Sequence, residues 1–208
     1  MDFSRIKNII FDLGGVIINI DFQYTYQAFA RLANTSPEDI AAKIKQYQFF
    51  QRYESGQLTD DQFRNEIRKV LAIPVSDHEI DSAWNALLLD IPEKRIRLIQ
   101  QLKNKYNIFL LSNTNAIHIY EVNKILFKST GVKKLDDLFH KAYFSYDIQL
   151  LKPHKEIYDY VLKDQKIKAG ETIFLDDNDD NITGAVGAGI HAIKVLNPSN
   201  ILEILKDA

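Results

Sequence analysis

Short runs of apolar residues, each followed by a polar or acidic residue, are the feature that most constrains the fold of this chain. Four runs are bounded by turn residues, at residues 9–11, 108–111, 172–175 and 192–195, and residues 142–144 are a fifth candidate. Runs that are apolar on both faces are typical of parallel strands covered on both sides. The chain is therefore expected to build a mainly parallel sheet.

Helical patterns fall between the later runs, at about residues 92–105, 116–127, 153–163 and 182–188. Alternation of strands and helices is typical of a doubly wound sheet with helices on both faces. The predicted fold class is therefore α/β, with a doubly wound, mainly parallel sheet.

Residues 21–90 interrupt this alternation with a series of helix-start signals. Ser36 precedes a proline suited to a first helical turn, and the segments that begin at Thr59 and Ser76 both fit the capping box. Apolar residues at helical spacing follow. We predict that residues 21–90 form an α-helical cap, inserted into a core domain of residues 1–20 and 91–208.

Composition narrows the classes of function. Among 208 residues, 26 basic and 28 acidic side chains give a formal net charge of −2, so no large positive field exists to hold nucleic acid. The absence of cysteine excludes disulfide scaffolds, thiolate zinc sites and cysteine nucleophiles. No apolar run matches a signal peptide or approaches the ~20 residues of a membrane span. We expect a cytoplasmic protein with no nucleic-acid or membrane partner.

Carboxylates follow two of the predicted strands. Asp12 comes directly after residues 9–11 and is followed by Gly14 and Gly15, while Asp176 and Asp177 follow residues 172–175. Taken alone, each segment could be a turn or a helix N-terminus. Ligands bind beyond the carboxyl ends of parallel strands, however, and adjacent acids repel unless a cation or protons intervene. Asp12 and one member of the acid pair are therefore expected to hold a divalent cation.

Two further segments offer groups suited to an anion. The strand at residues 108–111 is followed by Ser112 and Asn113, where a hydroxyl and free backbone N–H groups before a helix can bind phosphate. An N-cap is the commoner meaning of such residues. Lys152, next to Pro153, can neutralise phosphate charge. Together these segments predict a nucleophile, a hydroxyl donor, a cation and metal-binding acids at one edge of the sheet.

In this order, the four segments resemble the four motifs of the haloacid dehalogenase (HAD) superfamily, over essentially the whole chain. They read Phe11-Asp12-Leu13-Gly14, Leu111-Ser112-Asn113-Thr114, Lys152-Pro153 and Asp176-Asp177-Asn178. The resemblance is closest to the alpha-D-glucose-1-phosphate phosphatase-like subgroup. It implies a HAD-like Rossmannoid core with a helical cap, and a Mg²⁺-dependent phosphatase acting on a small phosphorylated metabolite such as a sugar phosphate.

The resemblance also implies a role for each matching residue. Asp12 would attack phosphorus and form an aspartyl-phosphate that water then hydrolyses. Its carboxylate, the Gly14 carbonyl and Asp177 would hold Mg²⁺, with Asp176 in support. The groups that would hold and neutralise the phosphoryl oxygens are Ser112, the Asn113 amide and Lys152.

One position departs from the family's pattern. HAD phosphatases usually carry a second Asp two residues after the nucleophile, which acts as general acid and base, and this chain has Gly14 there. General acid–base help is worth roughly 10²–10⁴ in rate. Three interpretations follow: a substrate with a good leaving group, such as an anomeric phosphate; a substitute acid, with Asp21 and Glu54 as candidates; or a protein that turns over slowly or only binds ligands.

Dehalogenation is the competing reaction, because a departing halide needs no proton. Against it, the acid pair at 176–177 suits magnesium, and a magnesium–phosphate site does not fit a neutral haloalkane. The sequence therefore favours the phosphatase.

The histidines show no metal-ligand spacing, although His118 and His154 lie near the motif loops.

Overall fold

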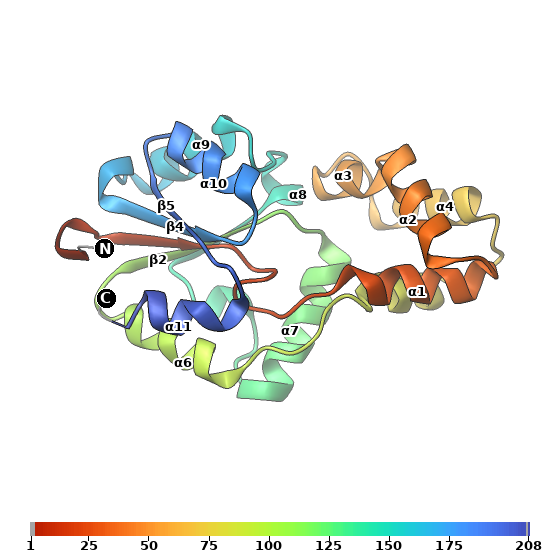
Figure 1. Ribbon diagram of the computed structural model, residues 1–208, viewed down its shortest axis with the longest axis horizontal. Helices are drawn as coiled ribbons and strands as arrows, with labels where there is room; N and C mark the ends of the chain where they lie inside the picture. The colour runs from red at the N-terminus through yellow and green to blue at the C-terminus, as the bar shows by residue number, and fades with distance from the viewer. Residues whose placement is uncertain (1–2, 207) are drawn as a thin grey trace.

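The computed structural model describes residues 3–206 and 208, and a five-stranded parallel sheet lies at its centre (Figure 1). Its strands are β1 (Asn8–Phe11), β2 (Asn107–Ser112), β3 (Lys141–Phe144), β4 (Thr172–Asp176) and β5 (His191–Lys194). They are ordered β3-β2-β1-β4-β5, and every neighbouring pair is parallel. The predicted fold class and all five predicted strands are confirmed. β1, which Asp12 follows, is the central strand.

Helices cover both faces of the sheet (Figure 1). One face carries α6 (Glu93–Leu102), α7 (Ala116–Thr130) and α11 (Ile201–Ile204), and the other carries α9 (Lys155–Gln165) and α10 (Asp179–Gly187). Because successive strand residues point to opposite faces, Ile9 and Phe11 pack in the first apolar layer and Ile10 in the second. This double coverage is why the strands read as continuous apolar runs. Among the described residues, no helix combines the length and apolar character that a bilayer crossing requires.

Two helix starts differ from the prediction. α10 begins at Asp179, three residues before the expected start, because the Asn178 side chain accepts hydrogen bonds from the N–H groups of Asp180 and Asn181 and so caps the helix. α9 begins at Lys155 rather than at Pro153. A short helix that the sequence did not predict, α8 (Ser145–Ile148), follows β3 directly.

The chain between β1 and α6 forms a helical body of its own. It contains α1 (Phe22–Ala33), α2 (Pro37–Tyr47), α3 (Phe49–Glu54), α4 (Asp60–Leu71) and α5 (Asp77–Asn85). The capping boxes at Thr59 and Ser76 are both formed, as predicted. Phe29, Phe63 and Trp84 are buried in an apolar cluster that is separate from the two beside the sheet. We call this body the cap; its boundaries at residues 21 and 90 stay a prediction.

Two paired linkers attach the cap to the core. Ile20 and Leu88 form an antiparallel bridge, and the Asn19 N–H donates to the Asp90 carbonyl at 3.0 Å. The Asn19 side chain also donates to the Asp90 carboxylate at 2.8 Å. The first linker follows the turn after β1, and the cap stands beyond the carboxyl edge of the sheet (Figure 1).

Candidate active site

The turn after β1 positions Asp12. The Asp12 N–H donates to the Leu175 carbonyl at 2.9 Å, which fixes Asp12 beside the end of β4. Gly15 then adopts φ +69°, and a Cβ atom there would lie 2.2 Å from Asp177 Oδ2. The Asp177 carboxylate thus lies against the bare backbone of Gly15, in a place that only glycine leaves open.

The three acids at this edge come together. Asp12, Asp176 and Asp177 each offer one carboxylate oxygen, and these oxygens lie within 4.8 Å of one another. Continued strand pleating would turn Asp176 and Asp177 to different sides. Both nevertheless offer an oxygen close to Asp12, because β4 ends at Asp176 and its pleat does not continue. Such a group of oxygens suits a hard divalent cation such as Mg²⁺.

Asp176 and Asp177 differ in their surroundings. Asp176 is fully buried and accepts hydrogen bonds from the Asn178 N–H at 2.8 Å and from the Asn181 side-chain amide at 3.0 and 3.1 Å. Asp177 is exposed. The carboxylate of Asp176 is therefore already held by hydrogen bonds from the protein, whereas Asp177 is accessible to solvent.

Lys152 lies between two of the acids. Its Nζ is 2.6 Å from Asp12 Oδ1 and 2.7 Å from Asp176 Oδ2, and its side chain is 1% exposed. Its backbone is held by Asn113, which accepts from the Lys152 N–H at 3.0 Å and donates to the Lys152 carbonyl at 2.9 Å. These two bonds join the Lys152 loop to the loop that follows β2.

Burial and neighbouring charges oppose one another in this cluster. Burial raises the pKa of Asp12 to about 7, Lys152 acts to lower it, and Asp176 raises it further. Burial disfavours the charged form of Lys152, but the two carboxylates outweigh it and the pKa of the lysine rises. Burial and Asp176 also raise the pKa of Asp177. Three carboxylates thus face one ammonium, and a divalent cation would balance the excess and keep Asp12 ionised.

The end of β2 supplies donors beside these charges. Ser112 is the last residue of β2 and is 3% exposed. The side-chain amide of Asn113 is hydrogen-bonded to the Lys152 backbone through both its oxygen and its nitrogen. The backbone N–H of Asn113 is therefore the group that can bind a ligand. The Thr114 N–H donates to Ser145 Oγ at 2.9 Å. Ser145 was not predicted from the sequence as a residue of the site. It directly follows β3, however, and residues at the carboxyl ends of parallel strands are expected near a ligand, as for Asp12.

A small cavity of about 70 Å³ separates this edge from the cap. Gly14 lines it, together with the polar residues Glu54, Ser112, Asn113, Thr114 and His118. A Cβ atom on Gly14 would lie 2.9 Å from Ile20 Cδ1, so the Ile20 side chain occupies the space beside this glycine. Asp21, the other candidate acid, accepts from the Gln23 N–H and caps α1.

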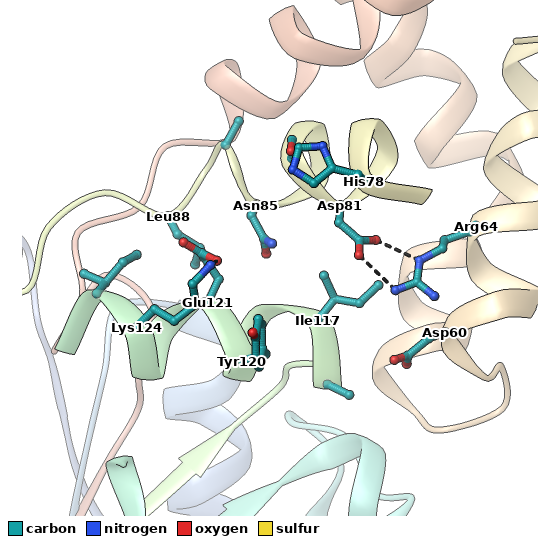
Figure 2. A pocket seen from close by; sticks show the side chains of 14 residues that line it. Asp60, Arg64, His78, Asp81, Asn85, Leu88, Ile117, Tyr120, Glu121 and Lys124 are labelled. Carbon is teal, nitrogen blue, oxygen red and sulfur yellow. Dashed lines mark hydrogen bonds and ion pairs between the residues drawn. The ribbon is translucent and has the colours of Figure 1, made fainter. Parts of the chain in front are cut away.

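A larger groove of about 680 Å³ lies elsewhere, between cap helices α4 and α5 and the core helix α7 (Figure 2). Figure 2 shows Arg64 of its lining paired with Asp81, at 2.9 Å for both nitrogen–oxygen contacts. None of the acids near Asp12 and neither Ser112 nor Lys152 lines this groove. The small cavity, in contrast, is lined by Gly14, Ser112 and Asn113, which lie at the same edge of the sheet as the acid cluster and Lys152. The candidate site is therefore this edge, with the small cavity beside it.

A parallel α/β core with a helical insertion after its first strand, and a buried aspartate–lysine pair under that insertion, has the organisation of a capped hydrolase. The chain belongs to the haloacid dehalogenase-like hydrolases, whose sequence profile matches residues 6–189. The predicted family is thereby confirmed.

Individual relatives agree with this assignment. D-ribitol-5-phosphate phosphatase of Bacteroides thetaiotaomicron is 35% identical over 177 residues, which are 85% of each chain. A HAD family enzyme of the same organism, crystallised with magnesium and inorganic phosphate, has a TM-score of 0.83 at 37% identity, over 91% of this chain and 93% of that one. A predicted HAD-like hydrolase of Porphyromonas gingivalis has a TM-score of 0.89 at 27% identity, over 98% of both chains.

Proposed function

We propose that the protein is a Mg²⁺-dependent phosphatase that hydrolyses a small phosphorylated metabolite through an aspartyl-phosphate on Asp12. The observation that carries this proposal is the meeting of Asp12, Asp176 and Asp177 within 4.8 Å, beside a buried Lys152. The likeness to a named phosphatase and to an enzyme crystallised with magnesium and phosphate supports it.

The residues at this edge fit magnesium. The ligands would be the Asp12 carboxylate, the Gly14 carbonyl and Asp177, whose carboxylate rests against Gly15. Asp176 supports them from behind, since Lys152 and Asn181 occupy its oxygens. Bound Mg²⁺ would supply positive charge for the phosphoryl oxygens and orient the phosphate in line with the nucleophile.

The protein's own groups account for the remaining steps. A carboxylate oxygen of Asp12 attacks phosphorus while the Ser112 hydroxyl and the Asn113 N–H donate to the phosphoryl oxygens. Lys152 offsets the charge of the phosphate from its place beside Asp12. Each such contact is worth ~3–4 kcal/mol of barrier, so the loss of one lowers the rate by about 10²–10³.

We place the substrate among sugar and sugar-alcohol phosphates. The family resemblance suggests glucose 1-phosphate, an anomeric phosphate, whereas the relative that is 35% identical is named for D-ribitol 5-phosphate, the phosphate of a primary alcohol. The cavity under the cap is the part of the site that would meet the sugar or polyol.

The site disfavours a dehalogenase. The acid cluster carries an excess of negative charge that a bound cation would balance. A neutral haloalkane, whose halide leaves without a proton, does not need such a cation for its cleavage. The third candidate, a poorly active protein that only binds ligands, depends on whether the chain replaces the acid missing at Gly14.

The deciding experiment measures phosphate release from glucose 1-phosphate, ribitol 5-phosphate and related phosphates, with Mg²⁺ and with a chelator. We expect release from at least one substrate, its loss with chelator, and its recovery when Mg²⁺ is restored. The variant Asp12→Asn is expected to lose turnover while its circular dichroism matches that of wild type. Activity of this variant near the wild-type level would remove Asp12 as the nucleophile, and no release from any substrate would contradict the phosphatase.

A further inference from the structure

The reaction proposed above needs a proton for its leaving group, and position 14 cannot supply one. Gly14 has no side chain, and the Ile20 side chain lies where a Cβ atom would point. An alcohol leaves as a strongly basic alkoxide unless an acid protonates its oxygen as the P–O bond breaks. If this chain cleaves alkyl phosphates, another side chain in the cavity must be the acid.

Two titratable side chains line the cavity, and one of them is unsuited to the task. Besides Glu54, the lining includes His118, whose ring nitrogens lie 3.1 Å from the Asn115 amide and 3.3 Å from the Trp84 carbonyl. Burial lowers the pKa of His118 to about 4, so its ring is neutral near pH 7. Its position is thus structural, as a packed partner of the Trp84 ring.

Glu54 belongs to the cap but is held against the core. It ends α3, and its carbonyl accepts from Ser145 Oγ at 2.6 Å. The same Ser145 Oγ accepts from the Thr114 N–H, next to the predicted phosphate donors. Helices α3 and α8 accordingly lie side by side across the junction of cap and core (Figure 1). One hydroxyl therefore fixes the backbone of Glu54 relative to the end of β2.

The turn after Glu54 makes a second close contact. Gly56 adopts φ +72°, and a Cβ atom there would lie 2.3 Å from the Tyr146 carbonyl oxygen. The two backbones approach as closely as glycine allows. The Glu54 segment is thus held against the first two residues of α8, by the Ser145 hydroxyl on one residue and by the close approach of Gly56 to the Tyr146 carbonyl on the other.

We propose that Glu54 is the general acid and base of this hydrolase, in place of the side chain absent at Gly14. The assignment rests on the proposed phosphatase function and deepens it. It also selects the substrate class, because an enzyme with this acid can cleave phosphates of ordinary alcohols and is not confined to anomeric ones.

The reaction has two steps, and Glu54 moves a proton in each. An Asp12 oxygen forms a bond to phosphorus as the P–O bond of the leaving alcohol breaks, and the carboxyl of Glu54 gives its proton to that alcohol oxygen. Water then attacks phosphorus, the bond between phosphorus and Asp12 breaks, and the Glu54 carboxylate takes a proton from the water. Inorganic phosphate leaves, and Asp12 and Glu54 return to their starting forms.

The surroundings of Glu54 agree with this assignment. Burial raises its pKa to about 7, while the charge of Lys152 acts in the opposite direction. Near pH 7 both the acid and the base forms are populated, which is the condition that general acid–base catalysis favours.

The experiment compares Glu54→Gln with wild type on two substrates of opposite leaving-group quality, ribitol 5-phosphate and 4-nitrophenyl phosphate. The rate of leaving-group release is measured in the first turnover, before hydrolysis of the aspartyl-phosphate limits it. We expect Glu54→Gln to lower this rate by about 10²–10⁴ for the alkyl phosphate and to change it little for 4-nitrophenyl phosphate, whose phenolate needs no proton. Retained activity on the second substrate also shows that the variant is folded.

A matched control is Glu66→Gln. Glu66 is also a half-buried cap glutamate, but it pairs with Arg52 at 3.0 Å and does not line the cavity. It is expected to match wild type on both substrates.

Equal losses on both substrates in Glu54→Gln, or no loss on either, would overturn the assignment while the phosphatase function stands. Wild-type activity confined to anomeric phosphates such as glucose 1-phosphate would overturn the assignment alone. No release from any phosphate of the panel would contradict the proposed function and this assignment together.

Discussion

Replacement of Gly15 by alanine tests the geometry of the acid cluster without altering any of its charges. The new Cβ would lie 2.2 Å from Asp177 Oδ2, whereas ordinary contacts begin near 3.4 Å. The carboxylate must therefore move by about 1 Å. Mg²⁺ holds its ligands at about 2.0–2.1 Å in near-octahedral geometry and tolerates such a displacement poorly. We expect Gly15→Ala to weaken Mg²⁺ binding by about 10–100-fold, the usual cost of disturbing the support of a metal ligand.

Backbone strain adds a separate cost, which a second glycine isolates. Gly15 has φ +69°, and an alanine in this left-handed region costs about 1–2 kcal/mol of stability. Gly131, at the end of α7, has φ +76° but nothing within 4 Å of the position of a Cβ. Gly131→Ala should therefore lose similar stability and keep wild-type Mg²⁺ affinity.

The two variants are compared by calorimetric titration with Mg²⁺ and by urea unfolding in the absence of metal. The expected outcome is a similar loss of stability in both and a loss of Mg²⁺ affinity in Gly15→Ala alone. Wild-type affinity in Gly15→Ala would refute the placement of Asp177 among the metal ligands. Equal weakening in both variants would show that strain, not the displaced carboxylate, is responsible.

Two further predictions concern buried titratable groups. Lys152→Met removes the ammonium group that Asp12 and Asp176 share, so without metal it should lower the free energy of unfolding by about 3–5 kcal/mol. Added Mg²⁺ should then raise the melting temperature of the variant more than that of wild type. Equal Mg²⁺ effects on both proteins would contradict this. His118 has a folded-state pKa of about 4, below its unfolded value, so the unfolded chain binds the extra proton between about pH 6.5 and 4. As pH falls through this window, the free energy of unfolding therefore drops by about 3 kcal/mol on account of His118. In urea unfolding, His118→Gln should lack this part of the decline. Parallel pH profiles of the two proteins would show that His118 is not buried in its neutral form.

The strands and the motif residues could be predicted because their signals are local. A strand covered on both faces is apolar throughout, and a reactive side chain at its carboxyl end stands next to that run, as Asp12 and Ser112 do. The order of the strands has no such signal, because it depends on which strands pair across the chain. Helix α8 has only four residues, too few to show a helical period.

Asp21 and Glu54 also differ in a way that depends on long-range contacts and not on local sequence. Both acids lie between β1 and α6, and their neighbours in the sequence do not tell them apart. Glu54 reaches the cavity through its contact with Ser145, which is 91 residues away, whereas Asp21 caps the helix that it precedes. Asn181 is a similar case, since its bonds to Asp176 appear only once α10 has formed. The residues that support the site are set by long-range packing, which a local pattern does not contain.

In the proposed mechanism, Asp12 is the group that takes up the phosphoryl group, and every later step depends on it. The most direct measurement is a single turnover of the wild-type protein with Mg²⁺ and its best substrate from the phosphate panel, quenched in acid at short times and mapped by peptide mass spectrometry. We expect a transient phosphoryl group on Asp12 that forms with release of the alcohol and decays as inorganic phosphate appears. Release of phosphate with no phosphorylated Asp12 at any time, or with the phosphoryl group on another residue, would contradict it.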